Sequence, residues 1–146
     1  MKDFDLAELT KSDTAKKLGI DNIPNGFEKD HLFALYTHII HPLEIALKKE
    51  IHVSSGFRSR ALNDAVGGSP SSLHLQGKAV DMYVDGMTTE ELFQFVIHQE
   101  SLKFDQCIQE FDQWVHVSYD PDKEVQRRDI LRAQHNRDGR VQYLRV

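Results

Sequence analysis

Hydrophobic residues between positions 28 and 49 recur at intervals of three and four, the spacing of one buried face of a long helix. Pro42 lies inside this pattern. Because proline has no amide hydrogen and clashes with the preceding turn, we expect a kink or a break near His41. The apolar positions of this face are Leu32, Leu35, Tyr36, Ile39, Ile40, Leu43 and Leu47.

Two shorter helical segments are predicted within residues 5–19. Thr10 and Ser12 are candidate caps, because their side-chain oxygens can accept from free amides at a helix start. Gly19 suits the left-handed conformation that often ends a helix. The stretch at residues 22–27 has the composition of a turn.

After the long helix the pattern changes to the shorter period typical of strands. One helix interrupts it at residues 88–99, where Thr88 and Glu91 have the spacing of a capping box. The tail is predicted to be a hairpin, because Asp138-Gly139 tolerates the positive φ angles of a tight turn. The remaining predicted elements are strands at 51–54, 79–84, 104–109 and 114–118, a short helix at 60–66, and tail segments at 125–134 and 140–146.

Helices therefore come first and mostly antiparallel strands later, which predicts an α+β fold with N-terminal helices packed on a small sheet. The 146 residues suit one domain, over positions 1–146. With 40% hydrophobic and 28% charged residues, the composition is that of an ordinary globular protein. No apolar run reaches the length of a membrane span.

The charge balance excludes some partners. With 18 Lys and Arg against 23 Asp and Glu, the net charge is −5, which makes binding to nucleic acid or to an anionic membrane a poor hypothesis. Cys107 is the single cysteine, so no internal disulfide forms. The N-terminus lacks the basic start and apolar core of a secretory signal, so we expect cytoplasmic synthesis. A monomer is the expectation, although no sequence feature addresses oligomeric state.

The densest polar cluster spans residues 72–81 and contains His74 and Asp81. In a helix these two would lie about 10 Å apart, too far to share one metal ion. They could share a metal only if Gly77 lets the chain turn and Asp81 lies on the following strand. Otherwise they are a surface histidine and a strand aspartate with no common partner.

A second cluster surrounds His116. In a strand, Val115 and Val117 would face the core while Trp114 and His116 face the other way. This arrangement suits the wall of a cleft, and it also suits an ordinary half-buried histidine. Together with His74 and Asp81, a set of two histidines and one aspartate would leave the fourth position of zinc open, as in catalytic sites.

Arg58 follows a short predicted strand and a glycine that permits a sharp turn. Its planar guanidinium could bind a carboxylate through two parallel hydrogen bonds. A structural ion pair at the surface is the alternative.

Ordered motifs over most of the chain resemble the zinc D-Ala-D-Ala carboxypeptidase family. That family includes phage and prophage endolysins, vancomycin-resistance dipeptidases and, distantly, the Hedgehog signalling domain. The stretch at residues 4–15 is also similar to the phage and prophage branch. The motifs are Ser54-Ser55-Gly56-Phe57-Arg58-Ser59, Leu62-Asn63, Gly67-Gly68-Ser69, Ser-x-His-x-x-Gly-x-Ala-x-Asp at 72–81, and Trp114-Val115-His116.

The resemblance implies a Hedgehog/DD-peptidase-like fold and a zinc cofactor (Zn2+). It implies that His74, Asp81 and His116 are the zinc ligands. Arg58 matches the arginine that holds a substrate carboxylate, and Ser72 matches a serine that lines the same cleft.

The general base departs from the commoner family pattern. Where many members have an acid three positions before the last histidine, this chain has Gln113, which cannot take a proton. Other branches place a glutamate six positions before it, which here is Glu110. Asp112 is the second choice, because in a regular strand it shares a face with His116; a bulge between residues 111 and 113 would change which acid points at the metal.

The resemblance implies hydrolysis of bacterial peptidoglycan stem peptides, either as a D-Ala-D-Ala carboxypeptidase or as an L-Ala-D-Glu endopeptidase. We expect action on the cell wall after phage-type release. The alternative is a non-catalytic zinc-stabilised structural or peptidoglycan-binding module of a phage or prophage particle, which Gln113 favours.

Overall fold

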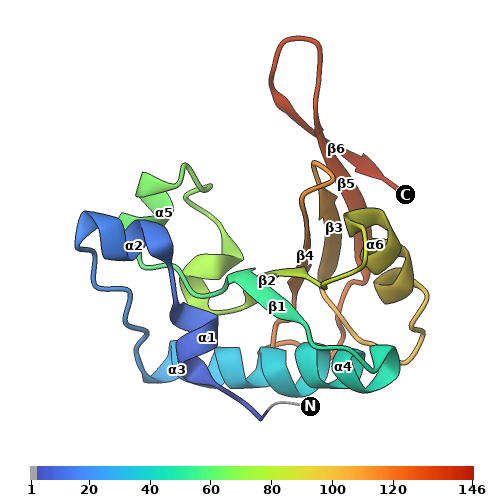
Figure 1. Cartoon of the computed structure of the whole chain (residues 1–146), viewed down its shortest axis with the longest axis horizontal. Coiled ribbons are helices and arrows are strands. Elements are labelled where there is room, and N and C mark those ends of the chain that lie inside the picture. The colour runs from blue at the N-terminus through green and yellow to red at the C-terminus, as the bar shows by residue number, and fades with distance from the viewer. Residues whose placement is uncertain (1–2) are drawn as a thin grey trace.

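The computed structural model describes residues 3–146. It consists of a six-stranded sheet with helices packed against it (Figure 1). Met1 and Lys2, the first residues of the N-terminal segment considered above, lie outside the described residues. The helices are α1 (Leu6–Thr10), α2 (Asp13–Leu18), α3 (Gly26–Leu35), the π-helix η1 (Tyr36–Ile40), α4 (His41–Leu47), α5 (Arg60–Ala65), the 3₁₀ helix η2 (Leu73–Gln76) and α6 (Thr89–Ile97). The strands are β1 (His52–Ser55), β2 (Ala79–Tyr83), β3 (Gln106–Glu110), β4 (Trp114–Ser118), β5 (Asp129–His135) and β6 (Val141–Arg145).

The N-terminal segment forms two short helices, as predicted. Ser12 caps α2 through its hydroxyl, and Gly19 ends α2 in the left-handed region at φ 67°. Thr10 does not cap a helix, which corrects that expectation. Its hydroxyl donates to the carbonyl of Leu6 within α1, and Asp5 caps α1 instead.

The long helix continues past Pro42, so the predicted break does not occur. Instead, the turn before the proline is wound as a π-helix, in which the amide of His41 donates to the carbonyl of Tyr36. Proline cannot donate and crowds the carbonyl four residues before it. A π-helical turn is a common place for a helix to absorb such an interruption.

The strand order is β1-β2-β4-β3-β5-β6, and all neighbours are antiparallel except the parallel pair β3–β5. This confirms the α+β fold with a mostly antiparallel sheet. The capping box at the start of α6 is also confirmed. The tail forms the predicted hairpin, β5–β6, which extends beyond the other strands (Figure 1).

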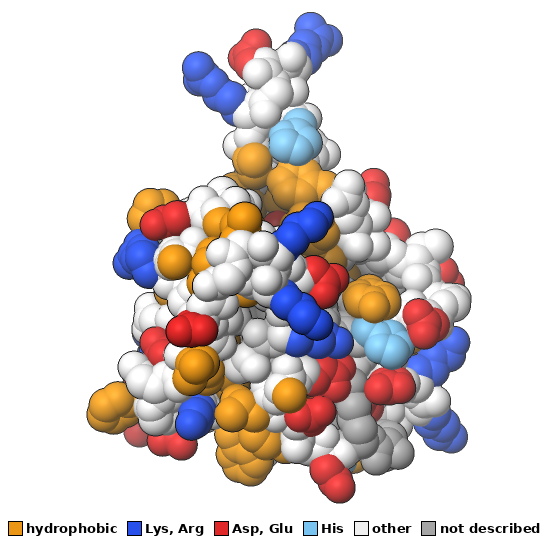
Figure 2. All heavy atoms as spheres, turned by 60° about the vertical axis from the view of Figure 1, so that its left-hand side comes forward, with side chains coloured by type: hydrophobic (Ala, Val, Ile, Leu, Met, Phe, Trp, Pro, Cys, Tyr) orange, Lys and Arg blue, Asp and Glu red, His pale blue; other side chains and the backbone are white. Residues whose placement is uncertain are grey.

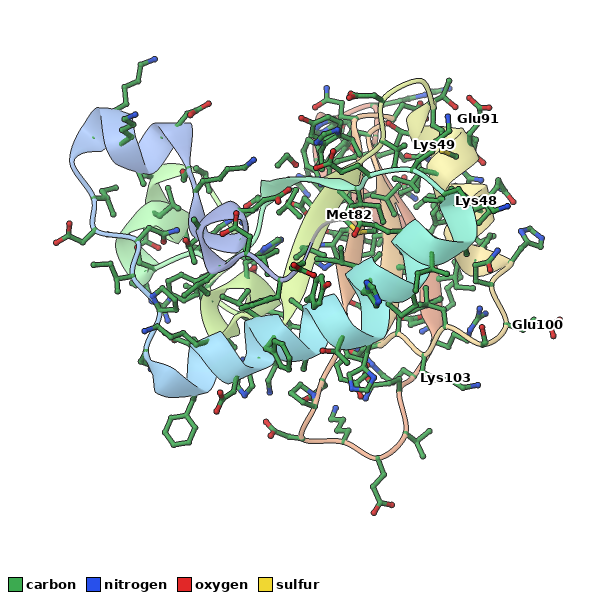
Figure 3. All side chains as sticks on the ribbon, turned by 60° about the horizontal axis from the view of Figure 1, so that its bottom comes forward. Lys48, Lys49, Met82, Glu91, Glu100 and Lys103 are labelled. Atoms are coloured by element: carbon green, nitrogen blue, oxygen red, sulfur yellow. The ribbon has the colours of Figure 1, made fainter. Side chains whose placement is uncertain are left out.

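One face of the sheet is covered by α3, α4 and α6, which join it in a single hydrophobic core. Val115 and Val117 of β4 point into this core, as predicted from the alternation. Met82 of β2 is also fully buried, and Figure 3 shows it in the interior. The charged residues labelled in that view lie around the outside: Lys48, Lys49, Glu91, Glu100 and Lys103.

The opposite face of the sheet, which we call the open face, carries the polar residues singled out above. Directly opposed residues on neighbouring strands point to the same side of a sheet. Asp81 is opposite His116, which is opposite Ile108, which in turn is opposite Leu131. The candidate site therefore lies in a row that crosses the open face. No described helix is long and apolar enough to cross a membrane.

Candidate metal centre and cleft

The structure brings His74 and Asp81 together with His116, which comes from a distant part of the sequence. Nε2 of His74 lies 3.2 Å from Oδ1 of Asp81, and Nδ1 of His116 lies 3.0 Å from the same oxygen. All three side chains belong to the group whose ligand atoms lie within 4.8 Å of one another. His74 and Asp81 are 3% and 4% exposed, so these two side chains are almost fully buried.

Gly77 places the first two members of the trio as the turn hypothesis requires. It ends η2 in the left-handed region at φ 71°, and β2 then carries Asp81 back past His74. A side chain at Gly77 would also collide with the backbone of Glu28 on α3, at 2.7 Å. Only glycine satisfies both requirements.

Gly56 fixes the ring of His74. Its carbonyl lies 2.7 Å from Nδ1 of His74, and a carbonyl can only accept, so Nδ1 carries the proton and donates. Gly56 itself packs so tightly against α1 that a Cβ would lie 2.2 Å from the carbonyl oxygen of Leu9. The backbone around Gly56 is thus held in place from both sides.

This tautomer indicates a cation. With Nδ1 of His74 protonated, the neutral ring turns the lone pair of Nε2 toward a carboxylate oxygen of Asp81, which has only lone pairs to offer. Two acceptors at 3.2 Å repel each other unless a positive charge lies between or beside them. In tetrahedral zinc sites with bonds of about 2.0–2.1 Å, neighbouring ligand atoms lie about 3.3 Å apart. The residues present therefore fit a zinc ion.

Two of the three protonation states favour metal binding. Burial lowers the pKa of His74, although the charge of Asp81 opposes this, which favours the neutral ring that a ligand needs. Burial raises the pKa of Asp81, but the two neighbouring histidines outweigh burial and hold the pKa below its usual range, so the carboxylate is ionised. Burial lowers the pKa of His116, but the hydrogen bond to Asp81 outweighs burial and raises the pKa, so a metal would have to displace a proton from this ring.

Arg58 lies beside the trio and is tied to it. One terminal nitrogen donates to Oδ2 of Asp81 at 3.3 Å, the other donates to Asn63, and Nε donates to Ser55 at 2.9 Å. The structural ion pair considered above is therefore present. Of the five guanidinium N–H groups three are used, which leaves one on each terminal nitrogen.

Glu110 stands at the end of β3, next to the trio. Its Oε1 lies 3.7 Å from Nδ1 of His116. Burial raises the pKa of Glu110, which makes it a better proton acceptor than an exposed glutamate. Burial, and then the charge of Glu110, also raises the pKa of Tyr143 on β6. The phenol of Tyr143 therefore lies on the same side of the sheet as Glu110.

Asp112 is placed elsewhere, because the chain between Glu110 and His116 is not a regular strand. Phe111 and Asp112 both have positive φ angles, 58° and 56°, and the amide of Gln113 donates to the carbonyl of Glu110. This is a tight hairpin turn between β3 and β4. The assumption of one shared face with His116 is thus wrong for Asp112, whose carboxylate accepts from the side chain of Gln109.

The trio opens into a cleft of about 640 Å³ over the open face of the sheet. Arg58 and Glu110 also line it, as does Ser72, whose hydroxyl accepts from the amide of His74. One wall is the polar loop between α5 and η2. The other wall is apolar and consists of Phe111, Trp114, Leu131, Val141 and Tyr143.

Sequence reasoning missed two parts of this cleft. The carbonyl of Gly56 could not be found, because no side chain signals it. The apolar wall on the tail hairpin had a signal: Val141 and Tyr143 are two positions apart along a predicted strand, so their side chains share one face.

A sequence model of the Peptidase M15 family matches residues 2–118, which include the whole trio, Arg58 and Glu110. The tail hairpin lies beyond the matched residues. No curated protein matches the chain significantly. With the family model covering most of the chain, the chain belongs to the Peptidase M15 family of peptidases.

Proposed function

We propose that this chain is a zinc-dependent peptidase that hydrolyses the stem peptides of bacterial peptidoglycan. The observation that carries the proposal is the buried trio of His74, Asp81 and His116, which opens into a cleft beside a carboxylate and an arginine. Membership of Peptidase M15 supports the reaction class, and the tautomer of His74 supports the metal.

His74, Asp81 and His116 would hold the zinc ion. When bound, zinc supplies Lewis-acid polarisation of a peptide carbonyl and makes water more acidic. Glu110 accepts the proton of the attacking water and delivers it to the leaving amine. Its pKa, which burial raises, makes Glu110 a stronger proton acceptor than an exposed glutamate.

Arg58 binds a free carboxylate of the substrate through its two remaining N–H groups, one on each terminal nitrogen. Ser72 lines the same cleft and contributes a hydroxyl to the polar wall. Stem peptides carry free carboxylates, so this anchor suits either a D-Ala-D-Ala carboxypeptidase or an L-Ala-D-Glu endopeptidase. We propose that the protein reaches the cell wall by phage-type release.

A turnover assay on purified peptidoglycan tests the proposal. We expect release of new amino termini by the zinc-loaded protein, loss of release after chelation, and recovery when zinc is added back. Glu110→Gln is the matched control, because it keeps size and metal ligands but cannot accept a proton. If the zinc-loaded protein binds peptidoglycan without releasing any product, the non-catalytic module that Gln113 favours replaces the peptidase.

A further inference from the structure

The order of the strands indicates in which direction a bound substrate runs along the cleft. This inference rests on the proposed function, in which Arg58 holds a carboxylate on the carboxyl side of the scissile bond. Arg58 follows β1, Asp81 lies on β2, His116 on β4 and Glu110 on β3, in the spatial order of the sheet. The amino side of the substrate then lies beyond Glu110, over β5 and β6.

The distance from β2 to β6 across the sheet is longer than an extended dipeptide. From β2 to β6 there are four strand steps, and neighbouring strands lie about 4.8 Å apart, which gives about 19 Å. An extended peptide covers about 3.5 Å per residue, so about five residues fit across this part of the sheet. The cleft volume of about 640 Å³ is likewise in the range of drug-sized ligands.

A row of residues beyond the metal centre forms an apolar trough. Trp114 is opposite Glu110, Glu110 is opposite Ala133, and Ala133 is opposite Tyr143, so all four side chains point to the open face. Ala133 is small and 2% exposed, whereas Trp114, Glu110 and Tyr143 line the cleft.

The far edge of the trough is unusually exposed for an apolar surface. Tyr143 and Val141 are 56% and 47% exposed, and Leu131 lies beside them in the cleft wall. At the turn, Phe111 stacks on His135 with ring centroids 4.6 Å apart, which joins the β3–β4 turn to the hairpin. Figure 2 shows hydrophobic side chains gathered at the base of the projecting hairpin. Exposed apolar side chains that continue a cleft mark a binding surface.

We propose that the β5–β6 hairpin binds the part of the substrate on the amino side of the scissile bond, with Tyr143 as its main contact. The enzyme then acts on substrates extended in that direction and discriminates against terminal dipeptides. Further stem residues and the muramyl sugar both present C–H faces that pack on an aromatic ring, so either continuation meets the chemistry of the trough.

The test uses synthetic substrates built around the bond that the wild type cleaves in purified peptidoglycan. A short substrate has one acetylated residue on the amino side; two long ones add further stem residues or N-acetylmuramic acid. We expect kcat/KM at least tenfold higher for a long substrate than for the short one. Whichever long substrate shows the gain identifies the continuation that the hairpin binds.

Tyr143→Ala is expected to lower kcat/KM about tenfold for the preferred long substrate, mainly through KM, and to lower it much less for the short substrate. Leu144→Ala is the matched control, because Leu144 is next in β6 and points to the opposite face. Equal kcat/KM for short and long substrates in the wild type would overturn the proposal. So would an equal loss on both substrates in Tyr143→Ala.

Failure of the proposed function looks different: no substrate of any length is then cleaved. In that case calorimetric titration of the zinc-loaded protein with the same compounds still tests the hairpin. Tighter binding of a long compound, lost in Tyr143→Ala and kept in Leu144→Ala, supports the hairpin site. Equal binding of short and long compounds refutes it.

Discussion

The two faces of the central sheet are built from the same strands and differ in what they carry. On the covered face, Met82 and its neighbours pack against α3, α4 and α6 with no exposed surface. On the open face, Asp81, the residue before Met82, meets two histidines and an arginine. Because side chains alternate along a strand, one face of the sheet carries the hydrophobic core and the other carries the candidate site. We therefore expect a substitution on one face to change the other face little.

Substitution of Asp81 or of Met82 is the most direct way to break this separation. Asp81→Ala removes a proposed metal ligand, so we expect much less zinc per chain in native mass spectrometry and turnover below detection. Met82→Ala leaves a cavity in the core and should lower the free energy of unfolding by about 2–5 kcal/mol while zinc stays bound. Full zinc content in Asp81→Ala, or zinc loss in folded Met82→Ala, would show that the two faces are not separable.

Glu110 on the open face and Asp112 in the adjoining turn sharpen the comparison. Glu110→Gln should lower kcat by about a hundredfold to ten-thousandfold with zinc retained, because the amide cannot accept a proton. Asp112→Asn should change kcat only slightly, since that carboxylate lies in the turn and accepts from Gln109. Loss of turnover in Asp112→Asn with an active Glu110→Gln would transfer the role of base to Asp112.

Arg58 belongs to both the cleft and the fold. Arg58→Lys keeps the charge but loses the planar fork, so we expect kcat/KM to fall at least tenfold, about 1.4 kcal/mol, mainly through KM. Tm should also fall, because bonds to Asn63 and Asp81 are lost. Ser55→Ala, which removes only the bond to Nε, is the control and should lower Tm with little change in KM. A lower Tm with unchanged kinetics in Arg58→Lys would leave Arg58 a purely structural role.

The smallest expected effect concerns the covered side. The hydrogen bonds from Arg132 lower the pKa of Glu90 to about 2 from its ordinary 4.5. A lowered folded-state pKa stabilises the fold above the unfolded pKa, and this contribution is lost as pH falls from about 4.5 to 2. Because the Glu90 side chain is 41% exposed, water weakens the pair, and we expect about 1 kcal/mol at most.

Urea unfolding of His116→Ala and of the double variant His116→Ala/Glu90→Gln at several pH values checks this expectation. The stability difference between the two proteins should shrink as the pH falls below 4.5. His116→Ala serves as the common background, so that loss of zinc at low pH does not enter the comparison. A difference that stays constant with pH would mean that Glu90 gains nothing from its charge.

Much of the fold follows from local pattern. The long amphipathic helix, the capping box at Thr88 and the hairpin at Asp138-Gly139 were all predictable, because each depends on residues within a few positions of one another. The interruption of the helix near Pro42 was predictable in place and not in form, since it is a π-helical turn. Whether a helix breaks or winds into a π-turn depends on how its two halves pack.

The candidate site divides in the same way. The identities of His74, Asp81 and His116 and the need for Gly77 to turn the chain came from the sequence and its family resemblance, because metal ligands must be of a few residue types. Only the tertiary structure decided the rest. The carbonyl of Gly56 sets the tautomer of His74, and the β3–β4 turn moves Asp112 away while Glu110 stays. The strand order brings Tyr143 beside the cleft. It depends on pairings between residues that are distant in the chain, and a local sequence pattern does not encode such pairings.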